Sequence, residues 1–293
     1  MSKSILGTGL SGLVGSRLVD LYKNNYNFEN LDLTTGVDIT KEDVVEKAVA
    51  KSDANVLVHF AAFTDVNKAF EQADNTQGLC YKVNVIGTKN IAKACKKHNK
   101  YLIHISTDFI FDGTKEEPYT ELDKPSPIEW YGKTKYLAEE EVKNSGTAFS
   151  ILRLAYPYRA SHPERVDMIR NTLKRLKDGN MYPPFSDHII TPTFIDDIAN
   201  VVNIVISQKP ESETFNLVGS SWHSDYEITK LIQEVFNLSG EIKEGSLEEY
   251  LKTSSRPYQK TMKISNQKLI DKLKYTPKTL KEGLEIIKKQ MKI

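Results

Sequence analysis

The sequence places a tyrosine and a lysine four positions apart, Tyr131 and Lys135, at the start of a stretch with helical periodicity. Side chains at this spacing project from the same face of a helix, so one substrate can meet both. A phenol is a poor acid–base group at neutral pH, but a fixed ammonium beside it favours the phenolate and lowers its pKa. We therefore predict that Tyr131 protonates a carbonyl oxygen as hydride arrives, or deprotonates an alcohol in the reverse direction.

A hydroxyl donor precedes this pair in the chain. Thr107 follows the apolar run 102–106, which is typical of a strand, and Asp108 stands beside it. Open α/β sheets bind their ligands at the carboxyl ends of the strands, so Thr107 is placed to donate a hydrogen bond to the same carbonyl oxygen. A Tyr and a Lys at this spacing occur by chance on many helices, and the upstream strand end makes the combination far more specific.

A glycine-rich turn follows the first apolar strand of the chain. Gly9 permits the tight turn, Gly12 lets backbone N–H groups approach a pyrophosphate, and Gly15 lets the next helix pack close to the sheet. In this strand–turn–helix context the pattern predicts a dinucleotide bound at a helix N-terminus. The loop residues expected to contact it are Gly9, Leu10, Ser11, Gly12, Leu13 and Val14.

An acidic residue, Asp32, ends the expected second strand 20 positions beyond Gly12. A carboxylate there would accept hydrogen bonds from the adenosine ribose hydroxyls, which favours NAD(H) as the cofactor. No Arg or Lys follows directly in residues 33–36 to hold a 2′-phosphate, although Arg17 could bend toward that site. NADP(H) therefore stays open as the alternative cofactor.

The elements that must position these residues alternate between short apolar runs and helical patterns, as in repeated βαβ units. The expected strands are residues 4–6, 28–33, 56–60, 102–106 and 150–154. The expected helices are residues 13–23, 41–50, 81–97 and 131–143. This order predicts an α/β fold with a Rossmann-type, doubly wound parallel sheet.

After about residue 155 the pattern loosens into shorter helices and proline-marked loops. We expect residues 1–155 to form an NAD(P)-binding Rossmann domain. Residues 156–293 are expected to form a smaller, interwoven substrate-binding domain, with segments that return to the first. Helix starts are expected at four capping pairs, namely Thr40 with Asp43 as an acidic variant, Ser224 with Glu227, Ser246 with Glu249, and Thr279 with Glu282.

Composition excludes several classes of function. Lys and Arg number 40 against 39 Asp and Glu, a net charge of +1, so no overall field favours nucleic acid or a membrane surface as a partner. The lysine-rich stretch 268–292 has the spacing of a solvated amphipathic helix.

Cys80 and Cys95 are expected to be buried free thiols, and no cluster has the ligand spacing of a metal site. With no membrane span or cleavable signal in the sequence, we expect a cytoplasmic protein.

The motifs together resemble a known family. The chain is similar nearly end to end to extended short-chain dehydrogenases/reductases, and within them most similar to dTDP-4-dehydrorhamnose reductases. The stretches that carry the resemblance are residues 8–15, 61–69, 106–113, 131–135, 192–193, 215–218 and 255–257.

The resemblance implies a role for particular residues. Thr107, Tyr131 and Lys135 match the catalytic triad of the superfamily, and Lys135 would also hold the nicotinamide ribose. Ala61 and Ala62 would lie along the cofactor. Asn84 matches an asparagine of the superfamily and would have a supporting role, with a helix-interior Asn bonded to local backbone as the alternative.

The resemblance also narrows the substrate chemistry. Related dehydratases carry a glutamate just after the Thr-Asp pair, whereas this chain has Phe109 beside Asp108, which argues against dehydration. Tyr156 stands where these reductases usually have a Trp near the sugar, and it could stack on a pyranose. These three residues are placed in the substrate site.

Three further residues are candidates for substrate contact. Arg159 and Arg256 are expected to anchor a substrate diphosphate, because a guanidinium pairs bidentately with phosphate oxygens. His188, next to Asp187, is expected as a loop histidine that touches substrate or cofactor.

The leading hypothesis is therefore an enzyme that reduces the 4-keto group of a nucleotide-linked deoxysugar, with hydride from NAD(P)H and a proton from Tyr131. One alternative is an NAD-dependent nucleotide-sugar epimerase. Another is a non-catalytic regulatory subunit resembling the methionine adenosyltransferase beta subunit, against which the complete triad argues. A homodimer is the default state of the superfamily.

Overall fold

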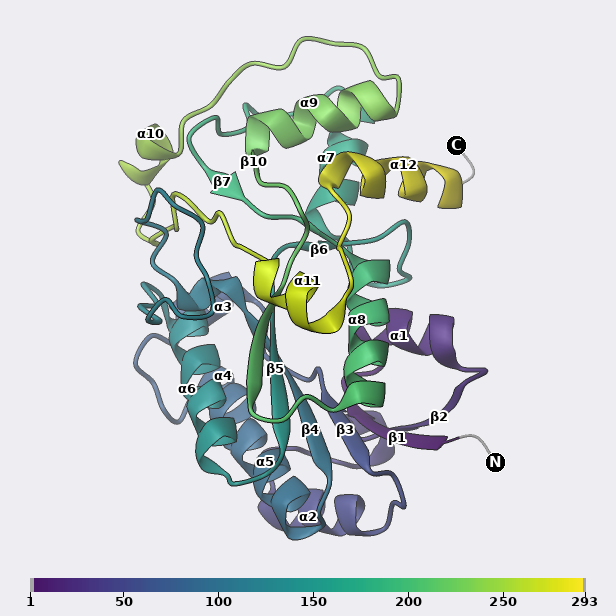
Figure 1. The fold of residues 1–293 in the computed structure, drawn as a ribbon. Helices are drawn as coiled ribbons and strands as arrows, with labels where there is room; N and C mark the ends of the chain where they lie inside the picture. The colour runs from purple at the N-terminus through teal and green to yellow at the C-terminus, as the bar shows by residue number, and fades with distance from the viewer. Residues whose placement is uncertain (1–2, 292–293) are drawn as a thin grey trace.

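A six-stranded parallel sheet forms the centre of the computed structural model, which describes residues 3–291 (Figure 1). Its strand order is β2-β1-β3-β4-β5-β9. The strands are β1 (Lys3–Thr8), β2 (Tyr26–Asn30), β3 (Val56–His59), β4 (Tyr101–Thr107), β5 (Phe149–Leu154) and β9 (Glu213–Leu217). The chain runs outward in both directions from β1 and β3, so the predicted doubly wound α/β fold is confirmed.

Helices cover both faces of this sheet because its strand residues are apolar on both sides. One face packs on α1 (Gly15–Tyr22), α8 (Ile195–Gln208) and α11 (Gln267–Leu273). The other face packs on α2 (Glu42–Ala50), α5 (Thr88–Lys97) and α6 (Trp130–Asn144). Alternate residues of each strand enter the two cores, as with Ile5 and Leu6 of β1, which are both fully buried.

The second half of the chain builds a separate apolar cluster above the carboxyl edge of the sheet (Figure 1). Its helices are α7 (Met168–Lys177), α9 (Asp225–Val235) and α12 (Leu280–Gln290). Two short pairings brace it, β6 (Pro157–Tyr158) with β8 (Thr193–Phe194) and β7 (Ile189–Ile190) with β10 (His223–Ser224). Strand β9 comes from the same half but joins the main sheet beside β5. The domain boundary at residue 155 stays a prediction.

The expected helix over 81–97 is interrupted in the structure. A short helix, α4 (Leu79–Tyr81), leads into a π-helical turn at Lys82–Gly87, and α5 begins only at Thr88. Within the turn the buried Asn84 side chain binds the backbone of Phe63. This long-range contact draws the turn toward the site, and π-turns of this kind are common at functional sites.

Several boundaries differ from expectation for local reasons. Strand β2 ends at Asn30, earlier than the expected 33, because Asp32 caps a 3-10 turn at Leu33–Thr35. The Thr40 capping box is wrong, since Thr40 binds Asp38 and Lys41 occupies the N-cap of α2 without a side-chain cap.

The capping boxes at Ser224 and Thr279 are confirmed as the starts of α9 and α12. Ser246 caps the start of the short helix α10 (Leu247–Leu251), with its hydroxyl accepting from the Glu249 amide. The remaining short helix is α3 (Val66–Phe70). Cys80 and Cys95 are free and buried, as predicted.

The C-terminal helix α12 has the amphipathic pattern expected of the lysine-rich stretch. Its Leu280, Leu284 and Ile287 are fully buried, while its lysines face outward or bind neighbouring carboxylates and carbonyls. Over residues 3–291, none of the helices combines the length and apolarity that a membrane crossing requires.

Candidate functional site

The glycine loop lies where β1 and β3 diverge, at the switch point of the sheet. Gly9 has a φ of +66°, and a Cβ there would lie 2.8 Å from the backbone nitrogen of Ala61. A Cβ on Gly15 would lie 2.5 Å from the Gly9 carbonyl oxygen. Only glycine allows these approaches, so the loop is closely packed between the start of α1 and the end of β3.

The start of α1 has neither a side-chain cap nor an acidic residue. Val14 precedes the helix without a side-chain cap, and the first turn of α1 carries no acidic residue. Uncapped N-terminal amides and the positive end of the helix dipole attract phosphate groups. A helix start of this kind is compatible with the pyrophosphate site that the sequence predicts, and the contacts of the loop residues with a cofactor stay a prediction.

Asp32 lies beside this loop but not in a strand. Its carboxylate accepts hydrogen bonds from the Thr34 amide at 2.8 Å and hydroxyl at 2.6 Å, and from the side-chain amide of Asn30. Burial opposes ionisation, but these hydrogen bonds outweigh it and hold the pKa of Asp32 below its ordinary value. Asp32 is thus a fixed carboxylate at the edge of the cofactor loop.

Arg17 points away from Asp32. Its guanidinium binds both carboxylate oxygens of Asp196 on α8, at 2.6 and 2.8 Å. The suggestion that Arg17 bends toward a 2′-phosphate therefore requires breaking a two-point ion pair.

A second close approach brings Tyr131 to the end of β4. Glu129 caps α6 by accepting from the amides of Tyr131 and Gly132, at 2.9 and 2.6 Å. A Cβ on Gly132 would lie 2.1 Å from the Phe109 carbonyl oxygen, so only glycine lets α6 lie against the turn after β4. The rings of Phe109 and Tyr131 meet edge to face at 5.5 Å.

Thr107 is next to this tyrosine. Its hydroxyl donates to Asp108 Oδ1 at 3.0 Å and accepts from the Phe109 amide at 3.3 Å. Burial raises the pKa of Tyr131 above its ordinary value, while the adjacent Thr107 hydroxyl acts in the opposite direction. The sequence predicts that Lys135 lowers the pKa of Tyr131, whereas in the structure burial raises this pKa.

Lys135 lies one helical turn further, under the same end of the sheet. It is buried, and its Nζ donates to the carbonyl oxygen of Ile105 at 2.7 Å. Burial lowers the pKa of Lys135 to about 8, and the buried carboxylate of Glu139 acts against that shift. The structure therefore brings Tyr131, Lys135 and Thr107 to one edge of the sheet beside the glycine loop.

Asp108 contributes a carboxyl to the same edge. Burial raises the pKa of Asp108 to about 7, against the hydrogen bond from Thr107. Its Oδ2 is buried and has no hydrogen-bond partner among the described residues. An unpartnered oxygen here is suited to a ligand hydroxyl.

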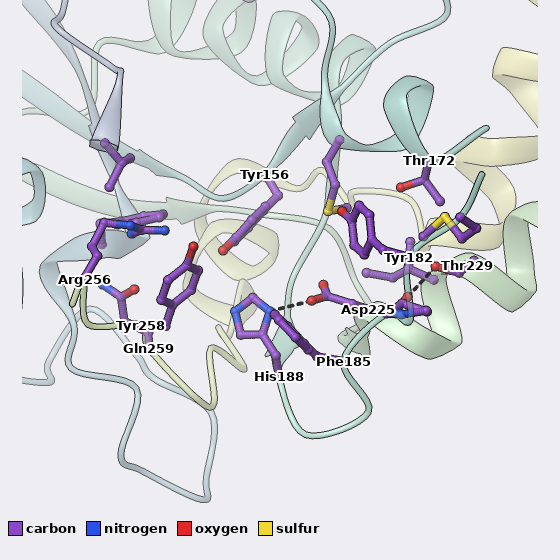
Figure 2. Close-up of a pocket in the computed structure, with 16 residues that line it drawn as sticks. Tyr156, Thr172, Tyr182, Phe185, His188, Asp225, Thr229, Arg256, Tyr258 and Gln259 are labelled. Carbon is purple, nitrogen blue, oxygen red and sulfur yellow. Dashed lines mark hydrogen bonds and ion pairs between the residues drawn. The ribbon is translucent and has the colours of Figure 1, made fainter. Parts of the chain in front are cut away.

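A cavity of about 310 Å³ opens beside this edge, between the sheet and the second half of the chain. Figure 2 shows the side chains that converge on it, among them Tyr156, His188, Asp225, Arg256 and Tyr258. The remaining lining residues are Val66, Phe109, Met168, Thr172, Met181, Tyr182, Pro184, Phe185, Ile228, Thr229 and Gln259. The lining is mainly apolar and aromatic with a few charged groups, as in sites for organic ligands.

Tyr156 links the cavity to the candidate catalytic edge, by which we mean the end of β4 where Thr107, Tyr131 and Lys135 lie. It has a φ of +41°, an uncommon conformation for a bulky residue, and its ring lies 6.3 Å from that of Phe109. Thr193 holds this bend, since its amide donates to the Tyr156 carbonyl at 3.2 Å and its hydroxyl donates to the Ala155 carbonyl at 2.6 Å. Local strain that the surrounding structure maintains is typical of functional sites.

The two candidate arginines have different surroundings. The Arg256 guanidinium lies 3.8 Å from the centre of the Tyr258 ring, on the cavity wall. Arg159 does not line the cavity, because its guanidinium binds the Leu13 carbonyl at 3.0 Å and the Ser16 hydroxyl at 2.8 Å. The structure thus places Arg159 against the glycine loop and the start of α1, outside the residues that line this cavity.

The structure gives His188 a carboxylate partner from another element. Its Nδ1 binds Asp225 Oδ2 at 2.8 Å (Figure 2), while the neighbouring Asp187 caps α10 through the Leu247 and Glu248 amides. Asp225 escaped sequence reasoning because the preceding Ser224 accounts for that stretch as a helix cap.

Two further polar residues lie beneath the candidate catalytic edge, His59, which the sequence did not reveal, and Asn84, for which it predicts a supporting role. His59 on β3 is buried and binds the hydroxyls of Thr8 and Thr88, at 2.6 and 3.0 Å. Burial lowers the pKa of His59 to about 3, so its ring is neutral. Asn84 donates to the Thr134 hydroxyl at 3.0 Å, which ties the π-turn to α6. For His59, the signal available in the sequence was a histidine at the end of an otherwise apolar strand.

Comparisons with known proteins agree with this geometry. A family model described as "RmlD substrate binding domain" matches residues 3–292. The dTDP-4-dehydrorhamnose reductase of Aggregatibacter actinomycetemcomitans is 32% identical over 206 residues, which are 70% of this chain and 67% of that protein.

Two solved structures with the same name are similar over almost the whole fold. The Bacillus anthracis dTDP-4-dehydrorhamnose reductase, in complex with NADP, has a TM-score of 0.89 at 26% identity and covers 99% of this chain and 100% of its own. The Clostridium acetobutylicum protein also has a TM-score of 0.89, at 29% identity, with 99% and 100% of the two chains covered.

Together the fold and the site define an oxidoreductase of the extended short-chain dehydrogenase/reductase type. Within that superfamily, the chain belongs to the RmlD substrate-binding family.

Proposed function

We propose that this protein reduces the 4-keto group of a nucleotide-linked deoxysugar, with hydride from a nicotinamide cofactor and a proton from Tyr131. The observation that carries the proposal is that Tyr131, Thr107 and Lys135 meet at the sheet edge between the glycine loop and an aromatic cavity. The named activity of the relatives, dTDP-4-dehydrorhamnose reduction, supports the same reaction for this chain.

The catalytic edge suits protonation of a carbonyl oxygen. Thr107 orients that oxygen with its hydroxyl, and Tyr131, whose raised pKa keeps it protonated, donates the proton. A reduced nicotinamide bound along the glycine loop supplies the hydride. Lys135 places a positive charge beside the phenol as negative charge develops on it.

The cavity suits a glycosyl nucleotide. Tyr156 presents an aromatic face on which a pyranose can stack, and the free Oδ2 of Asp108 can accept from a sugar hydroxyl. Arg256 supplies the cation for the diphosphate, whereas Arg159 instead stabilises the glycine loop.

We propose NAD(H) as the preferred cofactor, with NADP(H) as the alternative. The carboxylate of Asp32, whose pKa is lowered, lies beside the glycine loop and would repel a 2′-phosphate bound next to it, and residues 33–36 carry no basic side chain. Arg17, the candidate cation that the sequence offers, is held by Asp196. The Bacillus anthracis relative, however, is in complex with NADP, so direct titration of both cofactors decides the preference.

Two residues, Phe109 and Tyr131, favour reduction over the competing activities. Phe109 stands where dehydratases carry a glutamate, and a purely regulatory subunit has no need of an acid–base tyrosine. The test is oxidation of NADH or NADPH by the purified protein with a panel of dTDP- and GDP-linked 4-keto sugars. Turnover with any of them supports the proposal, and failure with the whole panel rejects it. Tightly retained NAD with no net cofactor consumption would favour epimerisation.

A further inference from the structure

The cavity contains a histidine whose orientation is fixed by a carboxylate. His188, only 6% exposed, directly precedes β7, and Asp225 directly follows β10. The antiparallel pairing of these two strands sets their separation, and the Asp225 amide donates to the His188 carbonyl at 3.3 Å. Nδ1 of His188 binds Asp225 Oδ2 at 2.8 Å, so Nε2 is the ring nitrogen left for a ligand.

Aromatic rings enclose this imidazole. The rings of Tyr156, Phe185 and Tyr258 meet it edge to face, with centroids 6.5, 6.4 and 6.4 Å away (Figure 2). Among the residues that the structure describes, Nε2 has no hydrogen-bond partner. A buried ring in a mainly apolar cage, with one nitrogen fixed and the other free, is a polar contact prepared for a ligand.

The charge of the cavity depends on this histidine. The titratable and charged groups around it are Asp225 of α9, Asp108 and Tyr156 at the sheet edge, Arg256 and Tyr258 of the segment after α10, and Tyr250 of α10. Among the lining residues Arg256 carries the one fixed positive charge and Asp225 the one carboxylate, and the carboxyls of Asp108 and of Glu129, which interacts with Arg256, lie close by. While His188 is neutral, the cavity therefore has no excess of positive charge to bind a diphosphate. Protonation of His188 supplies that positive charge.

We propose that a nucleoside diphosphate binds this cavity together with a proton, which His188 takes up. The proposal rests on the function proposed above. When Nδ1 donates to Asp225, the neutral ring presents the lone pair of Nε2, which repels phosphate oxygens. The protonated ring presents an N–H instead, so the bound anion stabilises the imidazolium and Asp225 becomes its counter-ion.

The other buried histidines of the site do not share this arrangement. His59 and His104 lie under the catalytic edge near the ammonium of Lys135, and burial lowers the pKa of both. They stay neutral at working pH. Asp108 and Lys135, with pKa values of about 7 and about 8, are alternative proton acceptors at the neighbouring sheet edge. Uptake that persists in His188→Gln would assign the proton to one of them.

The experiment is calorimetric titration of the full-length protein with dTDP, UDP, GDP and CDP in buffers of different ionisation enthalpy at about pH 7.5. The slope of heat against buffer enthalpy counts the protons exchanged. Wild type is expected to take up a fraction of a proton with the diphosphate that it binds. His188→Gln, which keeps a polar group but cannot titrate, is expected to bind about tenfold more weakly at about pH 6.5 and to lose the uptake.

Two variants act as controls. His98→Gln removes a histidine at the end of α5, outside the cavity, and is expected to retain the full uptake. Asp108→Asn is also expected to retain it. If the uptake disappears in Asp108→Asn and persists in His188→Gln, the proton belongs to Asp108 and the proposal is overturned.

Asp225→Asn keeps a hydrogen-bond acceptor but removes the counter-ion, and it provides a second test if His188→Gln fails to fold. Its uptake is expected to fall well below that of wild type, and an unchanged uptake contradicts the proposal. Binding of a diphosphate without any proton uptake rejects this inference alone. Failure of all four diphosphates to bind rejects the proposed function as well.

Discussion

The catalytic edge and the substrate cavity lie side by side, but different kinds of interaction build them. At the catalytic edge, backbone approaches at Gly9, Gly15 and Gly132 fix the elements, and a Cβ at any of them would clash with backbone. In the cavity, side chains distant in sequence meet across loops, as His188 and Asp225 do. The edge therefore tolerates almost no substitution of its glycines, whereas the cavity can change its ligand by exchanging side chains.

The largest effect is expected from breaking the chemistry of the edge alone. Tyr131→Phe removes the proton donor while keeping the ring that packs on Phe109. We expect kcat to fall about 10³-fold, with cofactor affinity nearly unchanged. Steady-state kinetics and cofactor titration measure the two. A loss of cofactor binding with the same loss of rate would mean that Tyr131 supports the fold of the loop instead.

The next effect tests whether backbone packing holds the edge in place. Gly132→Ala sets a methyl group against the Phe109 carbonyl, so α6 must shift and carry Tyr131 with it. We expect kcat to fall about a hundredfold and the free energy of unfolding to fall by about 1 to 3 kcal/mol.

Gly179→Ala is the matched control for this substitution, because a Cβ there meets no atom within 4 Å. We expect it to leave kcat unchanged, with only the strain of a positive φ to lower stability. Equal losses of kcat in both variants would contradict the account of Gly132.

Substitutions of Arg256 and Arg159 are expected to affect substrate binding and cofactor binding separately. Arg256→Ala is expected to raise the KM for the sugar nucleotide about thirtyfold, with little change in cofactor affinity, because it removes the cavity's arginine. Arg159→Ala removes a contact to the glycine loop at Leu13 and two to α1, at Ser16 and Asp20, and is expected to weaken cofactor binding about threefold. If the two variants exchange these effects, our placement of the diphosphate is wrong.

The last effect concerns pH at the edge and needs no substitution. Lys135 has a pKa lowered to about 8, so above that pH the amine loses the charge that stabilises the phenolate. We expect kcat/KM to fall about tenfold per pH unit above this value. Because an unfolded chain binds this proton more tightly, the cost to folding is present below about pH 8 and disappears as the pH rises toward the ordinary lysine value.

Glu139→Gln sharpens the pH prediction, because the Glu139 carboxylate opposes the lowering of the Lys135 pKa. The alkaline limb of the pH profile is expected to move to lower pH in this variant. A limb that stays in place would show that Lys135 does not determine it.

Sequence reasoning reached the edge better than the cavity, and the reason is physical. The glycine turn, the strand end at Thr107 and the Tyr131–Lys135 spacing each involve residues close together in sequence. Patterns of this kind can be recognised from the sequence alone. Periodicity predicts a strand through Asp32. The hydrogen bonds by which Asp32 caps the turn at Leu33–Thr35 leave no trace in the hydrophobic pattern.

Contacts distant in sequence were out of reach. Arg159 was assigned to the substrate by its residue type, and only the fold shows that Leu13 and Ser16 occupy its donors. The π-turn around Asn84 likewise follows from a contact with Phe63 that no periodicity predicts.

The central claim is net reduction of a sugar carbonyl at the edge that Tyr131 defines. Its most direct test is turnover of a 4-keto nucleotide sugar with cofactor deuterated at the transferable position of the nicotinamide, followed by NMR of the product. We predict deuterium at C4 of the sugar, with one cofactor oxidised for each sugar reduced. Conversion of the sugar without net cofactor oxidation, or oxidation that leaves C4 without deuterium, would contradict it.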